Sequence, residues 1–402
     1  MYVTRPLSMY RRSPATMEVP ASDAPYSGYL VITDEEAEAE DSYCWGLCRR
    51  NKVKKLPFPQ DKIFTIAHSS ERYRNSAIKV VLIPVPDQPL SSNRYFVIRA
   101  NGKHKGKACK CARERNIVSC CLSNLLNDKK PKAFNLKDLY QIFKIHTHHC
   151  GFFARSIVSD GIPPTFLRTK GWILHSSKTS YSKRSCRKLS EALGVDKALR
   201  SQLPRFHFPY TTQRSAPVVV GRWYCPFIFV REGVSRRFRR QMKKSIFYSM
   251  TLQQRWEEIY TCERREITME GENGAGVVVV NADVEREMVM VGGMKASKSD
   301  RVDPNGFYWY RAYDPRKRIR ASVGLSMAIV ENMRWVQEEG GRACGRERVV
   351  RIREQVRRLE GSEWQKLSCY VMVESFCLRR LDGRLLLRYD FRHTQKIRYK
   401  WE

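Results

Sequence analysis

The strongest constraint on the fold is a hairpin signal near the end of the sequence. Within CYVMVESFCLRRLDGRLLLRYDF (369–391), two β-like runs flank the pair Asp382-Gly383. An Asp-Gly pair in this position favours a tight β-hairpin, because the turn needs residues that accept a positive φ. The pair Asn101-Gly102, between NRYFVIRA (93–100) and KHKGKACKC (103–111), predicts a second hairpin. We therefore expect antiparallel strand pairing to dominate.

Other β-like runs occur along the whole sequence and are separated by turn-forming residues. Examples are VVVGRWYCPFIFV (218–230), VVVVNADVEREMVMV (277–291) and GFYWYRAYD (306–314). Hydrophobic residues make up 42% of the chain, which is enough to build a sizeable core. The pattern predicts an α+β protein of two β-rich, mainly antiparallel parts, with a few helices packed on the sheets.

Two helices are predicted in the second half of the chain. Thr251 and Gln254 have the spacing of a capping box, so a helix is expected over 252–260. Ser326 is a candidate N-cap for a second helix over 327–339, where apolar residues recur at helical spacing.

The same two regions contain an internal similarity, between SIFYSMTLQQRW (245–256) and SVGLSMAIVENMRW (322–335). It is either a true duplication or a chance likeness between two joints of strand and helix. The shared residues are packing and capping types, so the similarity indicates a structural role. Trp256 and Trp335, on the two expected helices, are predicted to anchor the core.

At 402 residues, the chain is long enough for two domains. LPRFHFPYTTQRSAP (203–217) is rich in Pro, Ser and Thr and is the candidate linker. We expect an extended N-terminal arm at 1–26, a β-rich N-terminal domain at 27–202, the linker at 203–217, and an α+β C-terminal domain at 218–402.

Net charge is the most unusual property of the composition. The sequence has 74 Lys and Arg against 41 Asp and Glu, a formal charge of +33. Such a surface attracts polyanions and anionic membranes, although a purely solvated surface is the alternative. The candidate binding residues lie on the tip of the expected hairpin and in the run RRFRRQMKK: Lys103, Lys105, Lys107, Arg236, Arg237, Arg239, Arg240, Lys243 and Lys244.

A group of cysteines and histidines is the candidate metal site. Thiolate and imidazole ligands suit zinc, but the spacing here fits no standard zinc module, so buried structural thiols are the alternative. The residues of the candidate set are Cys109, Cys111, Cys120, Cys121, His146 and His148.

The sequence gives no other sign of catalysis or of export. It has no secretory signal and no apolar stretch of about 20 residues. Its Gly-rich segments lack the spacing of phosphate-binding loops, and it has no Gly-x-Ser-x-Gly motif. Its thirteen cysteines follow no disulfide framework, which favours reduced thiols inside a cell. We expect an intracellular protein, cytoplasmic or nuclear and not secreted, that uses no cofactor.

Long segments of the chain resemble a plant family catalogued as domain of unknown function 1262. The segments are MYVTRPLSMYRRSP (1–14), SGYLVITDEE (27–36), CWGLC (44–48), QPLSSNRYFVIRANGKHKG (88–106), GFFARSIVSDGIPPTFLRTKGW (151–172), VVVGRWYCPFIFVREG (218–233), MTLQQRWEEIY (250–260) and DGRLLLRYDFRHTQKIRYKWE (382–402). The resemblance starts at Met1, so we expect the arm to be retained rather than cleaved.

The resemblance implies no catalytic or ligand residues, and the label "insecticidal crystal toxin" that some members carry supplies no mechanism. RRFRRQMKK (236–244) and CKCARERNIVSCC (109–121) depart from the family pattern. We expect a non-enzymatic interaction protein of plant stress or defence, whose basic surface binds an acidic partner: an anionic lipid surface, a nucleic acid or an acidic protein. The alternative is a metal-dependent protein or enzyme that uses the Cys/His residues.

Overall fold

The computed structural model describes most of the 402 residues. The described ranges are 1–43, 48–49, 52–53, 55–68, 78–114, 118–120, 123–125, 128–176, 189–209, 211–233, 238–264, 277–316, 318–341, 347–357 and 364–402.

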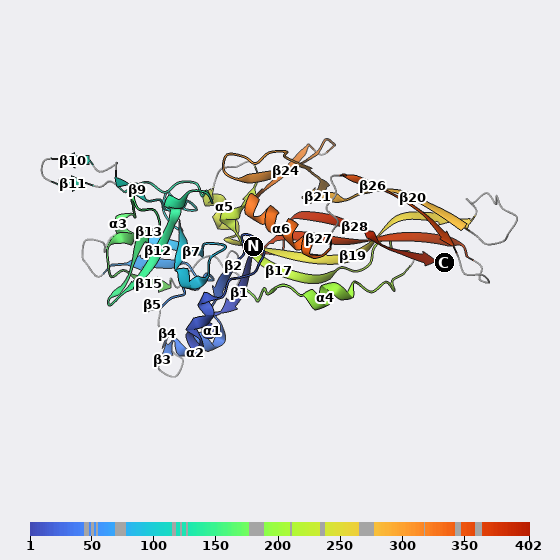
Figure 1. The fold of residues 1–402 in the computed structure, drawn as a ribbon. Coiled ribbons are helices and arrows are strands. Elements are labelled where there is room, and N and C mark those ends of the chain that lie inside the picture. Colours follow the sequence, from blue (N-terminus) through green and yellow to red (C-terminus); the bar gives the residue numbers. More distant parts are fainter. Residues whose placement is uncertain are drawn as a thin grey trace.

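The molecule is elongated and mostly β-sheet, with a large sheet toward one end and a smaller one toward the other (Figure 1). The large sheet has the order β2-β1-β17-β19-β27-β28-β21-β22, with β16 beside β17. Its strands are β1 (Tyr2–Pro6), β2 (Gly28–Ile32), β16 (Gly194–Val195), β17 (Val218–Pro226), β19 (Phe247–Glu263), β21 (Glu287–Val291), β22 (Met294–Lys295), β27 (Lys366–Arg380) and β28 (Leu385–Trp401). Strands β1 and β2 are parallel, whereas β17, β19, β27 and β28 pair antiparallel.

The smaller sheet has seven strands in the order β13-β12-β8-β7-β6-β15-β5. They are β5 (Lys52–Val53), β6 (Phe64–Ala67), β7 (Ile78–Pro84), β8 (Arg94–Arg99), β12 (Ile142–His148), β13 (Gly151–Ser156) and β15 (Ile173–Ser176). A four-stranded sheet contains β18 (Val230–Glu232), β25 (Ile319–Ser326), β24 (Phe307–Asp314) and β23 (Ser297–Lys298). Two-stranded ribbons pair β20 (Val277–Glu285) with β26 (Val349–Arg357), β3 (Ser42–Tyr43) with β4 (Cys48–Arg49), β9 (Ala112–Arg113) with β14 (Gly161–Ile162), and β10 (Val118–Cys120) with β11 (Ser123–Leu125).

The helices are short and lie around the sheets. They are α1 (Leu7–Arg12), α2 (Glu35–Glu40), α3 (Thr165–Arg168), α4 (Lys197–Gln202), α5 (Phe238–Lys244) and α6 (Met327–Glu339), with 3₁₀ turns at Pro14–Glu18, Leu90–Ser92, Leu139–Gln141 and Phe227–Phe229. The fold is therefore β-rich with mainly antiparallel sheets, which confirms the antiparallel pairing but corrects the expectation of an α+β protein. No helix of the described residues has the length and apolar composition needed to cross a membrane.

The N-terminal segment is built into the large sheet. Residues 1–26 were expected to form an extended arm, but they contain β1 and α1, and the Met1 side chain is 3% exposed. One continuous hydrophobic cluster also contains residues from both halves of the chain, with ring contacts of Phe134 to Phe96 and Phe229 at 4.9 and 5.1 Å. The expected linker at 203–217 packs along β19, where Ser215 N–H donates to Trp256 O. The division into two domains stays a prediction.

The two hairpin predictions have different outcomes. The Asp382-Gly383 hairpin is confirmed, because β27 and β28 pair on either side of it and Gly383 has a φ of 93°. Asn101-Gly102 does not form a two-residue turn. Instead, a longer loop over 100–106 returns the chain, and Gly106 N–H donates to Arg99 O.

The two helix predictions also differ in outcome. The helix expected at 252–260 is wrong, since these residues belong to strand β19. The helix expected at 327–339 is confirmed as α6, with the Ser326 hydroxyl accepting a hydrogen bond from Ala328 N–H. The similar segments 245–256 and 322–335 therefore run into different structures, which removes the structural basis for a duplication.

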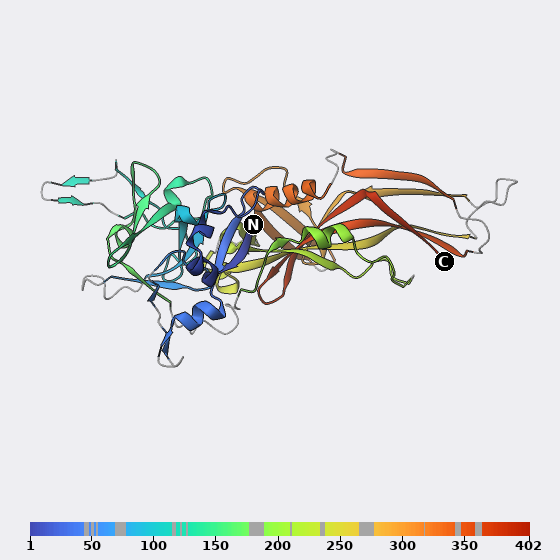
Figure 2. The same ribbon diagram turned by 60° about the horizontal axis from the view of Figure 1, so that its bottom comes forward.

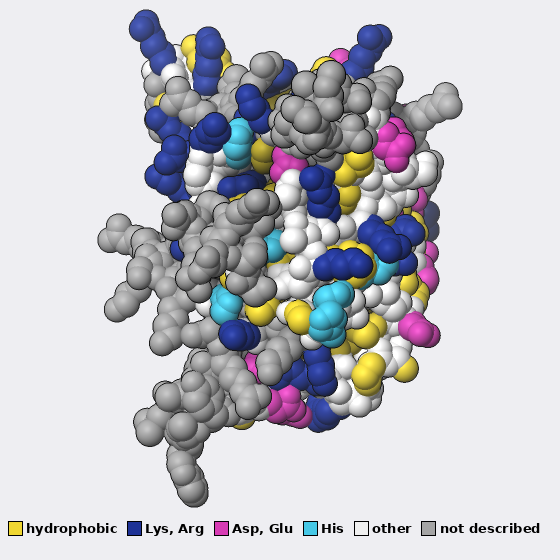
Figure 3. All heavy atoms as spheres, turned by 90° about the vertical axis from the view of Figure 1, so that its left-hand side faces the viewer, with side chains coloured by type: hydrophobic (Ala, Val, Ile, Leu, Met, Phe, Trp, Pro, Cys, Tyr) yellow, Lys and Arg dark blue, Asp and Glu magenta, His cyan; other side chains and the backbone are white. Residues whose placement is uncertain are grey.

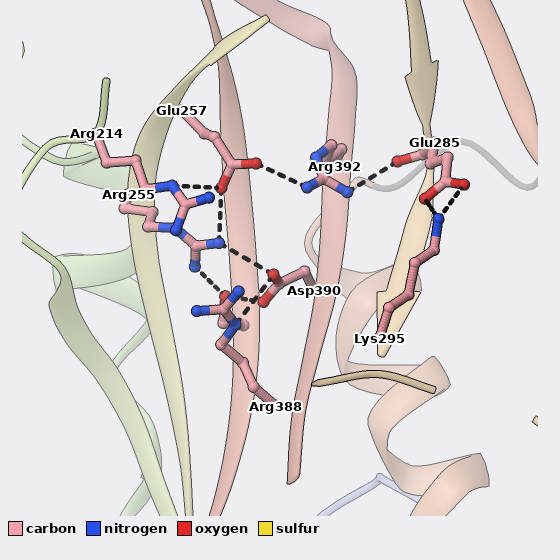
Figure 4. A network of polar contacts seen from close by, with 9 residues as sticks. Arg214, Arg255, Glu257, Glu285, Lys295, Arg388, Asp390 and Arg392 are labelled. Atoms are coloured by element: carbon pink, nitrogen blue, oxygen red, sulfur yellow. Dashed lines mark hydrogen bonds and ion pairs between the residues drawn. The ribbon is translucent and has the colours of Figure 1, made fainter. Parts of the chain in front are cut away.

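Charged residues hold the long strands β19 and β28 together across the central strand β27 (Figure 4). Arg255 on β19 contacts Glu257 at 2.9 Å and Asp390 on β28 at 3.1 Å. Arg392 on β28 closes the network by an ion pair of 2.7 Å with Glu257. Burial alone would raise the pKa of Glu257, but the hydrogen bond and charge of Arg392, together with Arg255, outweigh it and lower this pKa to about 2.

Candidate functional site

The first candidate segment is the loop that follows β8. Backbone bonds from Arg99 N–H to Lys107 O and from Gly106 N–H to Arg99 O, at 2.9 and 2.7 Å, close it into a compact turn. Lys103 is exposed and Lys107 is half-buried, so both side chains can reach a ligand at the surface. Lys105 differs from the expectation that the tip presents all three lysines, because its side chain folds inward and is 7% exposed.

The second candidate segment is α5, which is amphipathic. Gln241 and Met242 are buried, and the Gln241 amide donates to Val230 O at 2.5 Å and Phe227 O at 3.3 Å. These contacts fix the helix on the molecule and turn its basic side chains outward. The exposed ones are Arg239, Arg240, Lys243 and Lys244. Lys244 lies 3.7 Å from the Glu232 carboxylate. Arg236 and Arg237 lie outside the described residues.

These two segments, far apart in the sequence, meet in space. A Cβ atom added to Gly106 would lie 2.8 Å from the backbone oxygen of Phe238, the first residue of α5. The loop backbone therefore packs directly on the helix, and Gly106 leaves the room for it. We call the exposed or half-exposed cations of the two segments that pair with no described carboxylate the basic surface: Lys103, Lys107, Arg239, Arg240 and Lys243.

Arg231 holds the start of α5 in place. Its guanidinium lies between two rings, 4.0 Å from the centre of Phe238 and 4.7 Å from that of Phe307. Burial lowers the pKa of Arg231 to about 10, so it keeps its positive charge at neutral pH. The cation thus fixes Phe238, against which the loop packs, and adds positive charge beneath the basic surface.

The pKa of His104 reflects its burial and the positive charge of the loop. Burial, followed by the charges of Lys103, Lys107 and Arg99, lowers the pKa of His104. Its Nδ1 atom has no hydrogen-bond partner among the described residues. Figure 3 views the end of the molecule that carries the seven-stranded sheet, and Lys and Arg side chains crowd its upper left edge.

The structure separates the candidate metal ligands. Cys109 and Cys111 belong to the core of the seven-stranded sheet, where burial raises the pKa of their thiols to about 12 and about 11. His146 lies on β12 and stacks on Phe153 at 5.0 Å. His148 lies at the far end of the same strand. Cys121 and the Cys120 side chain lie outside the described residues. These buried, protonated thiols fit the structural alternative.

Sequence reasoning missed a cavity of about 600 Å³ between the N-terminal segment, α4 and α6. Trp223, Trp335 and Lys396 line it, and the Arg200–Glu374 ion pair lies at its wall. Helices α4 and α6 lie close together over the large sheet (Figure 2), and Arg200 joins them by donating to Val336 O at 2.9 Å. No local motif marks this cavity, because its walls come from segments far apart in the chain.

Part of the chain is similar to a described family. Residues 23–122 match the family described as "Protein of unknown function (DUF1262)", which confirms the resemblance over these residues. A solved structure described as "Crystal structure of Cry35Ab1" is similar to this one with a TM-score of 0.44 and 12% sequence identity, over 86% of this chain and 90% of that chain. No curated protein matches the chain.

Proposed function

We propose that this chain is a non-enzymatic interaction protein that binds a phosphate-rich polyanion through the basic surface. The packing of Gly106 on Phe238 carries the proposal, because these residues are 132 positions apart in the sequence and their contact brings two basic segments side by side. The setting that the family resemblance implies, inside plant cells and in stress or defence, is part of the same proposal.

The electrostatics of the site support this function. Lys103, Arg239 and Arg240 are exposed, so they can approach a ligand without losing much hydration. Acidic side chains neutralise other cations of the molecule, as Glu257 does for Arg392. On the basic surface the charges instead repel each other, and a polyanion relieves this repulsion while it releases its own counterions. Binding of this kind is strong at low ionic strength and needs no deep pocket.

Charge removal tests the proposal. The variant Arg239→Gln/Arg240→Gln/Lys243→Gln should bind duplex DNA, single-stranded RNA or anionic vesicles at least about tenfold more weakly than the wild type at low salt. The matched control removes three exposed arginines near β26: Arg348→Gln/Arg353→Gln/Arg357→Gln. Equal losses in the two variants would show that only net charge matters and would contradict a defined surface. The ligand with the largest difference identifies the partner class.

A second pair of variants tests the geometry without any change of charge. Gly106→Ala introduces a Cβ that collides with the Phe238 backbone, so the loop should separate from α5 and affinity should fall. Gly102→Ala is the matched control, because Gly102 has a similar positive φ, 69° against 83°, but no atom within 4 Å of the added Cβ. If both variants bind like the wild type, the two segments do not act as one surface.

A further inference from the structure

The tip of the hairpin between β12 and β13 gathers three side chains that ligate metals. Strands β12 and β13 pair as far as His148 opposite Gly151, which leaves His149 and Cys150 as the two turn residues. Donor atoms of His148, His149 and Cys150 all lie within 4.8 Å of one another, and the two imidazole rings are 3.9 Å apart. Among the described residues, this is the one group of three or more such side chains at that spacing.

Hydrogen bonds and a close contact hold the backbone of this tip in place. Phe152 N–H donates to Trp172 O at 2.8 Å, and Trp172 N–H donates back to Phe152 O at 3.1 Å. A Cβ on Gly151 would lie 2.3 Å from Trp172 O, so only glycine allows this close approach. The Trp172 side chain is fully buried, which ties the tip to the core of the seven-stranded sheet. The backbone that carries the three ligand residues is therefore fixed before any ion binds, which lowers the entropy lost on binding.

The chemistry of the three donors favours a borderline-soft cation. Imidazole nitrogen and thiolate sulfur are ligands that Zn²⁺ prefers, and two or three of them with water complete a tetrahedral sphere. The sequence analysis named His146 and His148 as candidate ligands. In the structure, His149 lies beside His148 instead of His146. The nearby thiol is that of Cys150, whereas Cys109 and Cys111 are buried. Unlike those two thiols, Cys150 is exposed, so an ion in solvent can reach its sulfur atom.

One internal hydrogen bond at the tip offers little competition to a metal. Cys150 N–H lies 3.5 Å from His148 Nδ1, a long contact that a metal bond can replace at low cost. Lys170 repels a cation, but at an exposed site water and salt screen this repulsion.

We propose that His148, His149 and Cys150 form a surface site for a Zn²⁺ ion, with Cys150 bound as thiolate and water as the remaining ligand. Binding releases the thiol proton to solvent and leaves one coordination position open to exchange. The site is independent of the basic surface, so either proposal can fail without the other. Figure 3 shows histidine side chains at the surface of this end of the molecule.

Cobalt substitution tests the site in the full chain, purified without a histidine tag and stripped of metal by a chelator. The wild type titrated with Co²⁺ should develop a near-ultraviolet thiolate charge-transfer band and the visible bands of a tetrahedral ion, and Zn²⁺ should abolish both. Cys150→Ser should lose the charge-transfer band, and His149→Ala should weaken Zn²⁺ binding about tenfold or more in a competition assay with a chromophoric chelator. Any other thiol of the chain contributes equally to the spectra of the wild type and of Cys150→Ser, so the difference between the two spectra belongs to this site.

The control is His207→Ala, which removes an exposed imidazole at a distant position. It should leave the spectrum and the Zn²⁺ affinity unchanged. Cys150 and His149 are exposed, so their variants should melt at the wild-type temperature; if Cys150→Ser does not fold, His149→Ala decides. Wild-type spectra and affinity in both tip variants, or an equal loss in His207→Ala, would overturn the proposal.

Discussion

Replacing Gly340, at the end of α6, by alanine should destabilise the fold through a contact with Arg200. An added Cβ would lie 2.1 Å from Nη2 of Arg200, which forms a buried ion pair with Glu374. The backbone itself would accept alanine, since its φ is −78°. Displacing Arg200 would leave the Glu374 carboxylate, 1% exposed, with fewer donors. We expect Gly340→Ala to lower the free energy of unfolding by about 1–3 kcal/mol, and Arg200→Ala by about 3–5 kcal/mol.

A double-mutant cycle separates this mechanism from a general effect of the helix end. In the Arg200→Ala background the added methyl group meets no guanidinium, so Gly340→Ala should then cost less than about 0.5 kcal/mol. The four proteins would be compared by urea unfolding. Additive costs for the two substitutions would show that Arg200 does not transmit the effect of the methyl group.

Residue-level expectations succeeded where the decisive contacts are local. The Ser326 cap was predictable because its partner, Ala328 N–H, is two residues away. The burial of Lys105 was not, because it depends on how the loop folds back on the rest of the molecule. The group formed by His148, His149 and Cys150 was predictable only in part, since the choice between His146 and His149 depends on strand register and turn geometry.

At the scale of elements, β19 shows how strand pairing overrides a local helix signal. Thr251 and Gln254 have capping-box spacing, but in the sheet they lie in one strand, opposite Arg222 and Val218 of β17 on one side and Cys377 and Glu374 of β27 on the other. A capping box stabilises a helix by about 1 kcal/mol, which is small beside the pairing and burial of a whole strand. The Asp382-Gly383 hairpin, by contrast, was predictable because its turn and its pairing are adjacent in sequence.

Trp256 keeps its expected role as a core anchor, although it lies on a strand. Its ring is 1% exposed, packs edge-on against Phe206 at 5.3 Å, and its indole N–H donates to Pro204 O. Trp256→Ala should therefore destabilise the protein by about 3–5 kcal/mol. Trp335 on α6 is only half-buried, and Trp335→Ala should cost clearly less. Thermal unfolding measures both, and equal shifts of the midpoint would contradict the ranking.

The network across β19, β27 and β28 should make stability depend on acidic pH. The folded-state pKa of Glu257 is about 2, below the usual 4.5, so its contribution is complete above pH 4.5 and is lost as pH falls toward 2. The contribution is at most about 3 kcal/mol. Glu257→Gln should be less stable at pH 7 and lose less stability between pH 4.5 and 2. Urea unfolding across this range measures the slopes, with exposed Glu339→Gln as the control. Parallel curves for all three proteins would rule out this role of Glu257.

For the molecule as a whole, composition predicted strand-rich architecture and positive charge, but not which segments meet. The N-terminal strand β1 pairs with β17, and Gly106 packs on Phe238; both contacts join segments far apart in the sequence. Such contacts depend on the complete arrangement of sheets, and no spacing within one segment encodes them. The basic surface is therefore a property of the tertiary fold, even though each of its charges is visible in the sequence.

The salt dependence of binding should distinguish this assembled surface from a diffuse positive charge. Each phosphate of duplex DNA that a cation neutralises contributes roughly 0.9 to the slope of log affinity against log salt. If Arg239, Arg240 and Lys243 each contact a phosphate, their removal should lower the slope by up to about 2.7. Removal of Arg348, Arg353 and Arg357, which lie outside the surface, should leave the slope unchanged. The measurement is a fluorescence-anisotropy titration at five or more salt concentrations. An equal decrease of the slope in both variants would mean that the polyanion binds the whole charged molecule without preference for the surface formed by the loop and α5.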